Sequence, residues 1–233
     1  MFDTREAAAR PLAEAVVAAA PPDPVVLALP RGGVPLGRIV ADALGAPLDL
    51  VFVKKIGLPG QRELAAGALV DGASPQTLWN RQVLSLSGLS EADFEDEIAQ
   101  LLDQIAERRR CYLAGRDPVP LKGRTAILVD DGIATGATVR VAVEAMRKAG
   151  VREVWVAVPV APADIVPALE AEADRVICLR VPDPFYAVGA HYRDFGEVTD
   201  EDVIRLLGSQ SDLPGTVDAL PSGPHMDGKE RKT

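Results

Sequence analysis

Cysteine and histidine are scarce in this sequence of 233 residues. The two cysteines, Cys111 and Cys178, lie far apart and belong to no CxxC motif. This spacing argues against a disulfide or a metal role, and it indicates reduced, partly buried thiols of a cytoplasmic protein. The two histidines, His191 and His225, have no partner at a spacing typical of a metal or catalytic site. Neither residue type therefore marks the chemistry of this chain.

Positive charge is also in short supply, since 25 basic residues face 34 acidic ones and the formal net charge is −9 at pH 7. A surplus of negative charge opposes long-range attraction to nucleic acid or to an anionic membrane surface, so neither partner is expected. A phosphate ligand would have to be held by local groups instead.

Long apolar runs are missing, and none approaches the roughly 18 uninterrupted residues of a membrane span. At the N-terminus, Asp3, Glu6 and Glu14 interrupt the apolar residues, which argues against a signal peptide. We interpret this stretch as an amphipathic helix capped by Asp3. The expectation is a soluble, cytoplasmic protein without a membrane partner.

Hydrophobic residues, at 48% of the chain, are plentiful enough for the core of one compact domain. Short apolar runs predict strands over residues 22–30, 47–57, 123–132, 151–161 and 174–182. Amphipathic or capped stretches predict helices over residues 31–46, 90–113, 136–150 and 163–173. This alternation favours an α/β fold, a mainly parallel, twisted sheet with helices on both faces, whose ligands bind at the carboxyl ends of the strands.

The stretch VDDGIATGAT, residues 129–138, places two acidic residues between a predicted strand and a predicted helix. Free backbone N–H groups at the start of a helix attract an anion, and the small residues of this loop suit a phosphate. Asp130 and Asp131 would repel a bare phosphate, but they can accept hydrogen bonds from the hydroxyls of a phosphorylated sugar. The chain has no GxGxxG after a strand and no GxxxxGK(S/T), so neither a dinucleotide fold nor a P-loop is indicated.

These residues closely resemble the ribose-phosphate signature of the type I phosphoribosyltransferases, in which an apolar run precedes two acidic residues and a TGxT loop. The resemblance implies that the ligand is 5-phosphoribosyl-1-pyrophosphate. It implies that Asp130 and Asp131 contact the ribose hydroxyls. It also implies a loop that wraps the 5-phosphate, formed by Ile133, Ala134, Thr135, Gly136, Ala137 and Thr138.

A second loop, LPRGGVPLG at residues 29–37, is similar to the pyrophosphate loop of the same family. Backbone N–H groups near Arg31, Gly32 and Gly33 would face the diphosphate, and Arg31 would add charge. Taken alone, the stretch also fits an ordinary glycine turn between a strand and a helix.

Lys54 and Lys55 end the next predicted strand, on the same edge of the sheet as the two loops. One of them could reach the diphosphate, although a solvated strand end fits the pair nearly as well. Residues 56–70 fall where the family carries a mobile loop that closes over the reacting centre and excludes water. Within them, ELAAGALV could be an exposed strand or a hairpin arm.

The reaction implied by the resemblance replaces pyrophosphate at C1 of the ribose with a nitrogen nucleophile. The catalytic residues would be Asp130, Asp131, Arg31 and Lys55, and Mg²⁺ would lie near one of the aspartates, directly or through water. No carboxylate stands between Asp131 and Thr138, so this loop supplies no general base. Two alternatives stay open: a regulatory protein that senses the ribosyl pyrophosphate or a nucleotide, and a hydrolase or phosphorylase of related sugar phosphates.

The likeness is closest to a bacterial branch of the family that has no settled substrate, and it covers residues 1–208. We expect these residues to form one domain, with a small hood built from residues 73–115 and 183–208. The family often dimerises, so a homodimer is an open expectation. Residues 209–233 are polar and rich in proline and glycine, which predicts a disordered tail.

An aromatic cluster lies in the last organised segment, at Phe185, Tyr186, Tyr192 and Phe195. Under the resemblance, these rings could stack on the planar base that receives the phosphoribosyl group. The alternative is a small satellite core that pins the C-terminal helix. The sequence does not name the base.

Overall fold

The computed structural model describes residues 1–72 and 75–208. The tail predicted over residues 209–233 lies outside the described residues. Within the described part, no helix combines the length and the apolar composition needed to cross a bilayer.

A five-stranded sheet forms the centre of the molecule, and every neighbouring pair of its strands is parallel. The strand order is β2-β1-β6-β7-β8. The strands are β1 (Pro24–Ala28), β2 (Leu48–Leu50), β6 (Thr125–Val129), β7 (Glu153–Val160) and β8 (Arg175–Arg180). The nearly continuous apolar sequences of the central strands β6 and β7 match burial on both faces, as expected of parallel strands, whereas the edge strand β8 is only partly buried.

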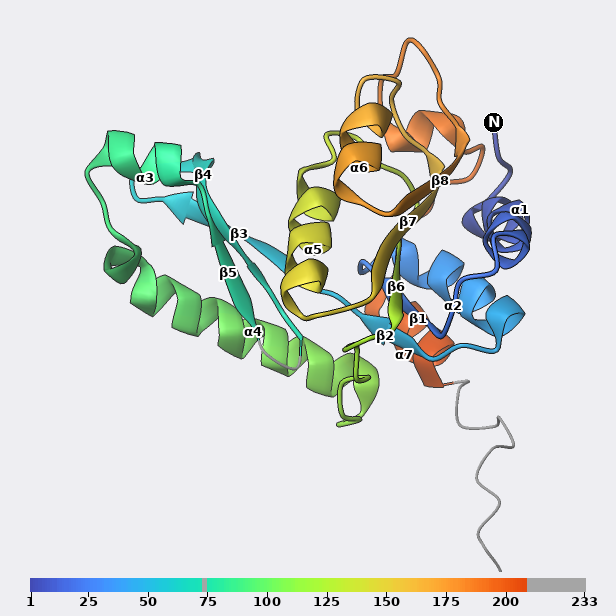
Figure 1. Cartoon of the computed structure of the whole chain (residues 1–233), viewed down its shortest axis with the longest axis horizontal. Helices are drawn as coiled ribbons and strands as arrows, with labels where there is room; N and C mark the ends of the chain where they lie inside the picture. Colours follow the sequence, from blue (N-terminus) through green and yellow to red (C-terminus); the bar gives the residue numbers. More distant parts are fainter. Residues whose placement is uncertain (73–74, 209–233) are drawn as a thin grey trace, which may run out of the picture.

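Helices cover both faces of this sheet (Figure 1). Helices α1 (Arg5–Ala18) and α2 (Gly33–Leu44) pack on the face to which Val26 and Ile127 point. Helices α5 (Ala137–Lys148) and α6 (Val166–Glu172) lie on the opposite side, where α5 packs against neighbouring strand residues such as Leu128. The side chains of β1 and β6 therefore alternate between two cores, and the predicted α/β fold class is confirmed.

The cap of the first helix lies one residue later than predicted. Thr4, not Asp3, is the capping residue, because its side chain accepts a hydrogen bond from the backbone N–H of Ala7 at 3.2 Å. Asp3 pairs with Arg193 instead, at 2.8 Å.

A second, antiparallel sheet projects from the central one, to the left in Figure 1. It contains β3 (Val53–Leu58), β4 (Gln61–Val70) and β5 (Gln76–Trp79). The chain continues into α3 (Arg81–Ser87), the short helix η1 (Glu91–Phe94) and α4 (Glu95–Leu113). The stretch ELAAGALV is thus part of a hairpin arm, and residues 56–70 form most of the β3–β4 hairpin.

The prediction of one strand over residues 47–57 was wrong, because the chain leaves the parallel sheet after Leu50 and starts a strand of the other sheet at Val53. Long-range polar contacts fix this break. Asp71 accepts a hydrogen bond from the backbone N–H of Phe52 at 2.6 Å. Arg109 of α4 donates to the carbonyl of Leu50 at 3.2 Å and pairs with Asp71 at 2.7 Å.

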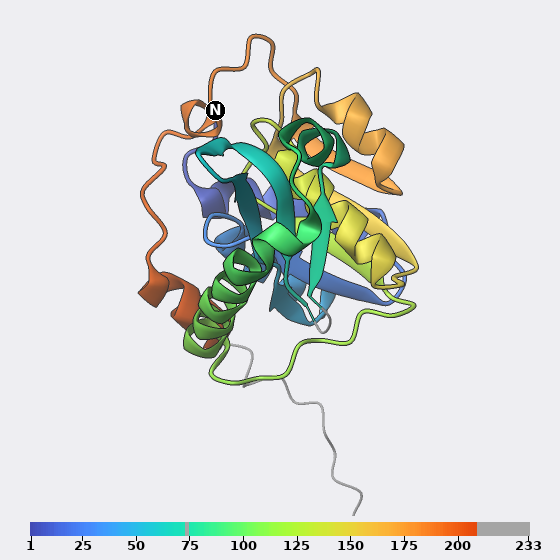
Figure 2. The same cartoon turned by 90° about the vertical axis from the view of Figure 1, so that its left-hand side faces the viewer.

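The C-terminal segment returns across the molecule after β8. It passes through the short helix η2 (Val188–His191) and ends in α7 (Asp200–Gly208), which packs against α2 and α4. Figure 2 shows α7 beside the C-terminal half of α4. Helix α7 therefore joins the projecting part of the molecule to the central domain. The assignment of residues 73–115 and 183–208 to a hood remains a prediction.

Candidate functional site

Two loops meet at the carboxyl ends of the adjacent strands β1 and β6. The backbone N–H of Leu29 donates to the carbonyl of Val129 at 2.9 Å, which continues the sheet pairing into both loops. A Cβ atom on Gly33 would lie 2.4 Å from that same carbonyl oxygen, and one on Gly32 would lie 2.3 Å from the carboxylate of Asp131. Only glycine permits this approach. The two motifs predicted from the sequence therefore form one continuous surface.

The start of α5 presents backbone donors without acceptors. Gly136 is the N-cap residue and has a left-handed φ of 74°. Within residues 1–72 and 75–208, the N–H groups of Thr135, Gly136 and Thr138 donate to no protein acceptor, and both threonines are exposed. Ile133 differs, since it is 2% exposed and its N–H donates to the carbonyl of Val160. The open donors at the positive end of a helix are suited to an anion.

Asp131 is held by an arginine from the other end of the chain. Two guanidinium nitrogens of Arg5 each lie 2.8 Å from one carboxylate oxygen of Asp131. Asp131 is only 9% exposed, and its carbonyl accepts a hydrogen bond from the hydroxyl of Tyr192. Arg5 stands at the first position of α1, 126 residues away in sequence, and no local pattern marked it as a site residue.

Asp130 lies half-buried beside this ion pair, and no cation of the described residues pairs with it. One of its carboxylate oxygens accepts the N–H of Asp131 at 2.8 Å. Burial and the negative charge of Asp131 hold the pKa of Asp130 well above its usual value, against smaller opposing effects of the Asp131 N–H and of the charge of Arg5. Burial also raises the pKa of Asp131, while the hydrogen bond and charge of Arg5 act in the opposite direction. The two neighbouring acids therefore have different environments.

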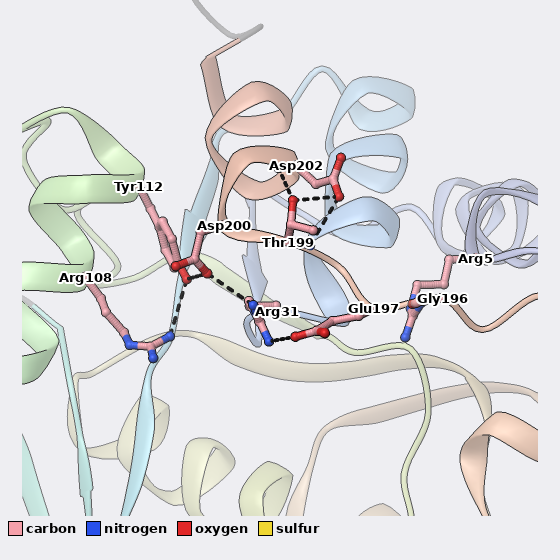
Figure 3. A network of polar contacts seen from close by, with 9 residues as sticks. All are labelled: Arg5, Arg31, Arg108, Tyr112, Gly196, Glu197, Thr199, Asp200 and Asp202. Atoms are coloured by element: carbon pink, nitrogen blue, oxygen red, sulfur yellow. Dashed lines mark hydrogen bonds and ion pairs between the residues drawn. The ribbon is translucent and has the colours of Figure 1, made fainter.

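Arg31 stands in the second loop, after a cis peptide bond to Pro30, but its side chain is engaged by the C-terminal segment. Figure 3 shows its guanidinium between Glu197 and Asp200, the latter at 3.3 Å. Asp200 also accepts a hydrogen bond from the hydroxyl of Tyr112 in α4 at 2.7 Å. Burial and this hydrogen bond raise the pKa of Tyr112 to about 12.

The two predicted lysines do not lie at the end of a parallel strand. Lys54 and Lys55 belong to β3 of the antiparallel sheet, because the chain has already left the central sheet. Lys54 is half-buried, and burial and the nearby charge of Arg108 lower its pKa. Lys55 is exposed and lies 3.5 Å from Glu63. The prediction that both lysines end a strand of the parallel sheet, beside the two loops, was therefore wrong.

The aromatic cluster is largely occupied by packing. Tyr192 is 5% exposed and lies between Phe2 and Phe195, with ring centroids 5.6 and 5.0 Å away. The ring of Phe185 stacks on His191 at 5.2 Å, whereas Tyr186 is 84% exposed. This arrangement agrees with the satellite-core alternative. The cluster packs around Phe2 near the N-terminus, however, and not around the C-terminal helix.

The donor set limits how a metal ion could be held. The described residues contain no group of three or more His, Cys, Asp or Glu side chains arranged to hold a metal ion. Both cysteines are free thiols, as expected. Cys178 is half-buried, whereas Cys111 is exposed and not partly buried as predicted.

Mg²⁺ is commonly bound by one or two carboxylates together with the phosphates of a substrate. Asp130, which lacks a protein cation among the described residues, fits that mode.

Comparison with known proteins agrees with this geometry. The phosphoribosyl transferase domain family matches residues 4–193. Two relatives from Mycobacterium tuberculosis are each 40% identical over 230 residues. They are "Putative phosphoribosyl transferase MT0597" of strain CDC 1551 / Oshkosh and "Putative phosphoribosyl transferase Rv0571c" of strain ATCC 25618 / H37Rv. The match covers 97% of this chain and 52% of each relative, so the chain spans about half the length of these curated relatives.

A solved structure is also similar along most of its length. The crystal structure of TT1426 from Thermus thermophilus is 43% identical to this chain, with a TM-score of 0.76. The match covers 88% of this chain and 97% of TT1426. The family match, these relatives and the shared architecture lead to one conclusion: the chain belongs to the phosphoribosyl transferase family.

Proposed function

We propose that this chain binds 5-phosphoribosyl-1-pyrophosphate with Mg²⁺ and transfers the phosphoribosyl group to a nitrogenous base. One observation carries the proposal: backbone donors at the start of α5, without acceptors among the described residues, lie next to an acidic pair. The carboxylate of Asp131 in that pair lies against Gly32 of the second loop. A ligand with a phosphate, vicinal hydroxyls and a diphosphate matches this order of groups.

The 5-phosphate would accept hydrogen bonds from the N–H groups of Thr135, Gly136 and Thr138, where the helix dipole favours negative charge. Asp130 would accept a hydrogen bond from a ribose hydroxyl. The backbone around Gly32 and Gly33 would face the diphosphate, with Arg31 supplying charge after it leaves its acidic partners. These contacts would fix the sugar between its two anionic ends.

In the proposed reaction, the bond between C1 and the diphosphate oxygen breaks and a bond from C1 to the nitrogen of the base forms. Pyrophosphate leaves, and the nitrogen loses its proton. Positive charge develops on the sugar, and backbone donors and Arg31 would stabilise the negative charge that grows on the leaving group. Mg²⁺ held by Asp130 and the ligand would supply further neutralisation of the diphosphate. Residues 132–138 contain no carboxylate, so the proton must leave to a group outside this loop.

The remaining parts of the proposal are a cytoplasmic location and the absence of nucleic acid and membrane partners. The sequence features behind them are the net charge of −9 and the lack of a long apolar run. A homodimer is compatible with the proposal. A sensor of the same ligand is the main alternative, because it would need the binding groups without the acceptor base.

Calorimetry with 5-phosphoribosyl-1-pyrophosphate, with and without Mg²⁺, tests the binding part. We expect Asp130→Asn to weaken binding by roughly tenfold or more, since a charge-assisted hydrogen bond contributes about 1.5–3 kcal/mol. Asp103→Asn is the matched control, because Asp103 is exposed on α4 and carries the same chemical change. Unchanged affinity of Asp130→Asn would contradict the assignment.

Release of pyrophosphate across a panel of purine, pyrimidine and other nitrogen bases then separates an enzyme from a sensor. Base-dependent release by the wild type, lost in Asp130→Asn, supports transfer. Tight binding without release by any base supports the sensor. Release that needs no base supports a hydrolase.

A further inference from the structure

We infer that Arg5 is a positioning residue that divides the acidic pair into two roles. Asp131 anchors the site through its ion pair with Arg5, and Asp130 is the acid that contacts the ligand. This inference rests on the proposed function and deepens it, because it assigns the ribose contact to one aspartate and makes an N-terminal residue part of the site.

The guanidinium of Arg5 is enclosed on several sides. Two of its nitrogens contact one oxygen of Asp131, and the third donates to the carbonyl of Gly196 at 2.6 Å. Its carbon lies 3.9 Å above the ring centre of Phe195. The Arg5 side chain is only 11% exposed. A cation with this many partners has little freedom to leave, so the geometry of the Asp131 carboxylate is fixed.

Asp131 is also confined from its other sides. Its carboxylate lies against the Cα atom of Gly32, where any Cβ atom would clash, and its carbonyl accepts the hydroxyl of Tyr192. Arg5 therefore acts on both loops through a single side chain. Its ion pair holds the carboxylate of Asp131 in place, and that carboxylate lies against Gly32 in the second loop.

Asp130 has none of these restraints among the described residues. Its only hydrogen bond there is to the N–H of its neighbour, and no cation pairs with it. When both carboxylates are ionised, two negative charges lie side by side, and Arg5 pairs with the one on Asp131. Asp130 thus keeps free oxygen acceptors for a hydroxyl group, or for Mg²⁺ held jointly with the ligand.

Without Arg5, the charge of Asp131 would stand uncompensated beside Asp130 and close to a ligand with several phosphate groups. Like charges at this distance repel, and the carboxylate could rotate toward the position of the sugar. Loss of Arg5 should therefore weaken ligand binding through Asp131. In a chain without the Asp131 charge, loss of Arg5 should matter little.

The first test needs no ligand. Chemical unfolding of Arg5→Gln, Asp131→Asn, Asp130→Asn and the two double variants gives a double-mutant cycle for each aspartate. We expect strong coupling of Arg5 to Asp131 and weak coupling to Asp130. Arg10→Gln is the control, because Arg10 is exposed on the same helix. Equal coupling to both aspartates, or none to Asp131, would overturn the division of roles.

The second test uses calorimetry with 5-phosphoribosyl-1-pyrophosphate and Mg²⁺, at a temperature where circular dichroism shows every variant folded. We expect Arg5→Gln to bind roughly tenfold more weakly and Arg5→Lys to recover part of the affinity. In the Asp131→Asn background, Arg5→Gln should cause no further loss. A full additional loss there would overturn the inference, because a residue that merely stabilises the fold acts independently of Asp131.

The two tests also separate this inference from the proposed function. If the wild-type chain does not bind 5-phosphoribosyl-1-pyrophosphate, the proposed function fails, and the unfolding cycle still decides whether Arg5 acts on Asp131 alone. If Arg5→Gln fails to fold, Arg5→Met, which keeps a long apolar side chain and removes the charge, takes its place in both cycles. Should Asp131→Asn weaken ligand binding as much as Asp130→Asn while Arg5→Lys binds like the wild type, the assignment of Asp130 as the contacting acid is wrong.

Discussion

The two loops of the site differ in how ready they are for a ligand. The loop before α5 offers backbone donors without acceptors among the described residues, and its conformation depends on local glycine and threonine chemistry. The loop before α2 carries Arg31, which is already neutralised by Glu197 and Asp200. A phosphate can occupy the first loop directly, whereas a diphosphate at the second must compete with two carboxylates for Arg31. The C-terminal segment contacts both loops but acts differently on them, because it neutralises Arg31 at the second loop and supports Arg5 and the carbonyl of Asp131 at the first.

The contact between the two loops is the largest effect to test. Gly33→Ala would place a Cβ atom 2.4 Å from the carbonyl oxygen of Val129, so the loops must move apart. Overpacking of this kind typically costs about 1–3 kcal/mol of unfolding free energy, and ligand binding should be lost with it. Denaturant unfolding measures the cost. Gly208→Ala is the control, because no atom of the described residues lies within 4 Å of its added Cβ; equal stability of the two variants would show that the loops do not depend on this approach.

Competition for Arg31 should have an intermediate effect. Glu197→Gln combined with Asp200→Asn frees the guanidinium, and exposed ion pairs of this kind contribute about 0.2–1 kcal/mol each. We therefore expect pyrophosphate to bind roughly threefold to tenfold more tightly, as measured by calorimetry with Mg²⁺. The control removes the same two charges elsewhere, through Glu170→Gln and Glu201→Gln, both exposed. If the control gains as much affinity, the effect is one of net charge and not of release of Arg31.

The smallest effect concerns Tyr112, whose hydroxyl donates a hydrogen bond to Asp200, one of the two carboxylates that pair with Arg31. The pKa of Tyr112 is raised to about 12 by burial and by its hydrogen bond to Asp200. The folded state therefore holds this proton more tightly than the unfolded state, whose tyrosine titrates near pH 10. Its contribution to stability is complete below about pH 10 and is lost as the pH rises toward about 12. Tyr112→Phe should flatten this part of the stability profile, and an unchanged alkaline slope in thermal unfolding would contradict the role.

The order of strands and helices followed from patterns that lie within short stretches of sequence. Apolar runs of five to eight residues and amphipathic periods are local patterns. They predict the elements correctly because a strand buried on both faces needs apolar residues at nearly every position. The strand at residues 47–57 failed for the opposite reason. Its break depends on Asp71 and Arg109, which are distant in sequence and invisible to a local pattern.

The candidate site divides in the same way. The sequence by itself determined the order of strand, acidic pair and helix start at residues 129–138. The reason is local, because Gly136 adopts the left-handed cap and the first N–H groups of any helix lack intrahelical acceptors. Only the tertiary structure decided which partners these groups have. Arg5 reaches Asp131 across 126 positions, and Glu197 reaches Arg31 across 166. Ion pairs of this kind form only after folding has brought distant segments together, and no period or spacing along the sequence indicates which segments will meet.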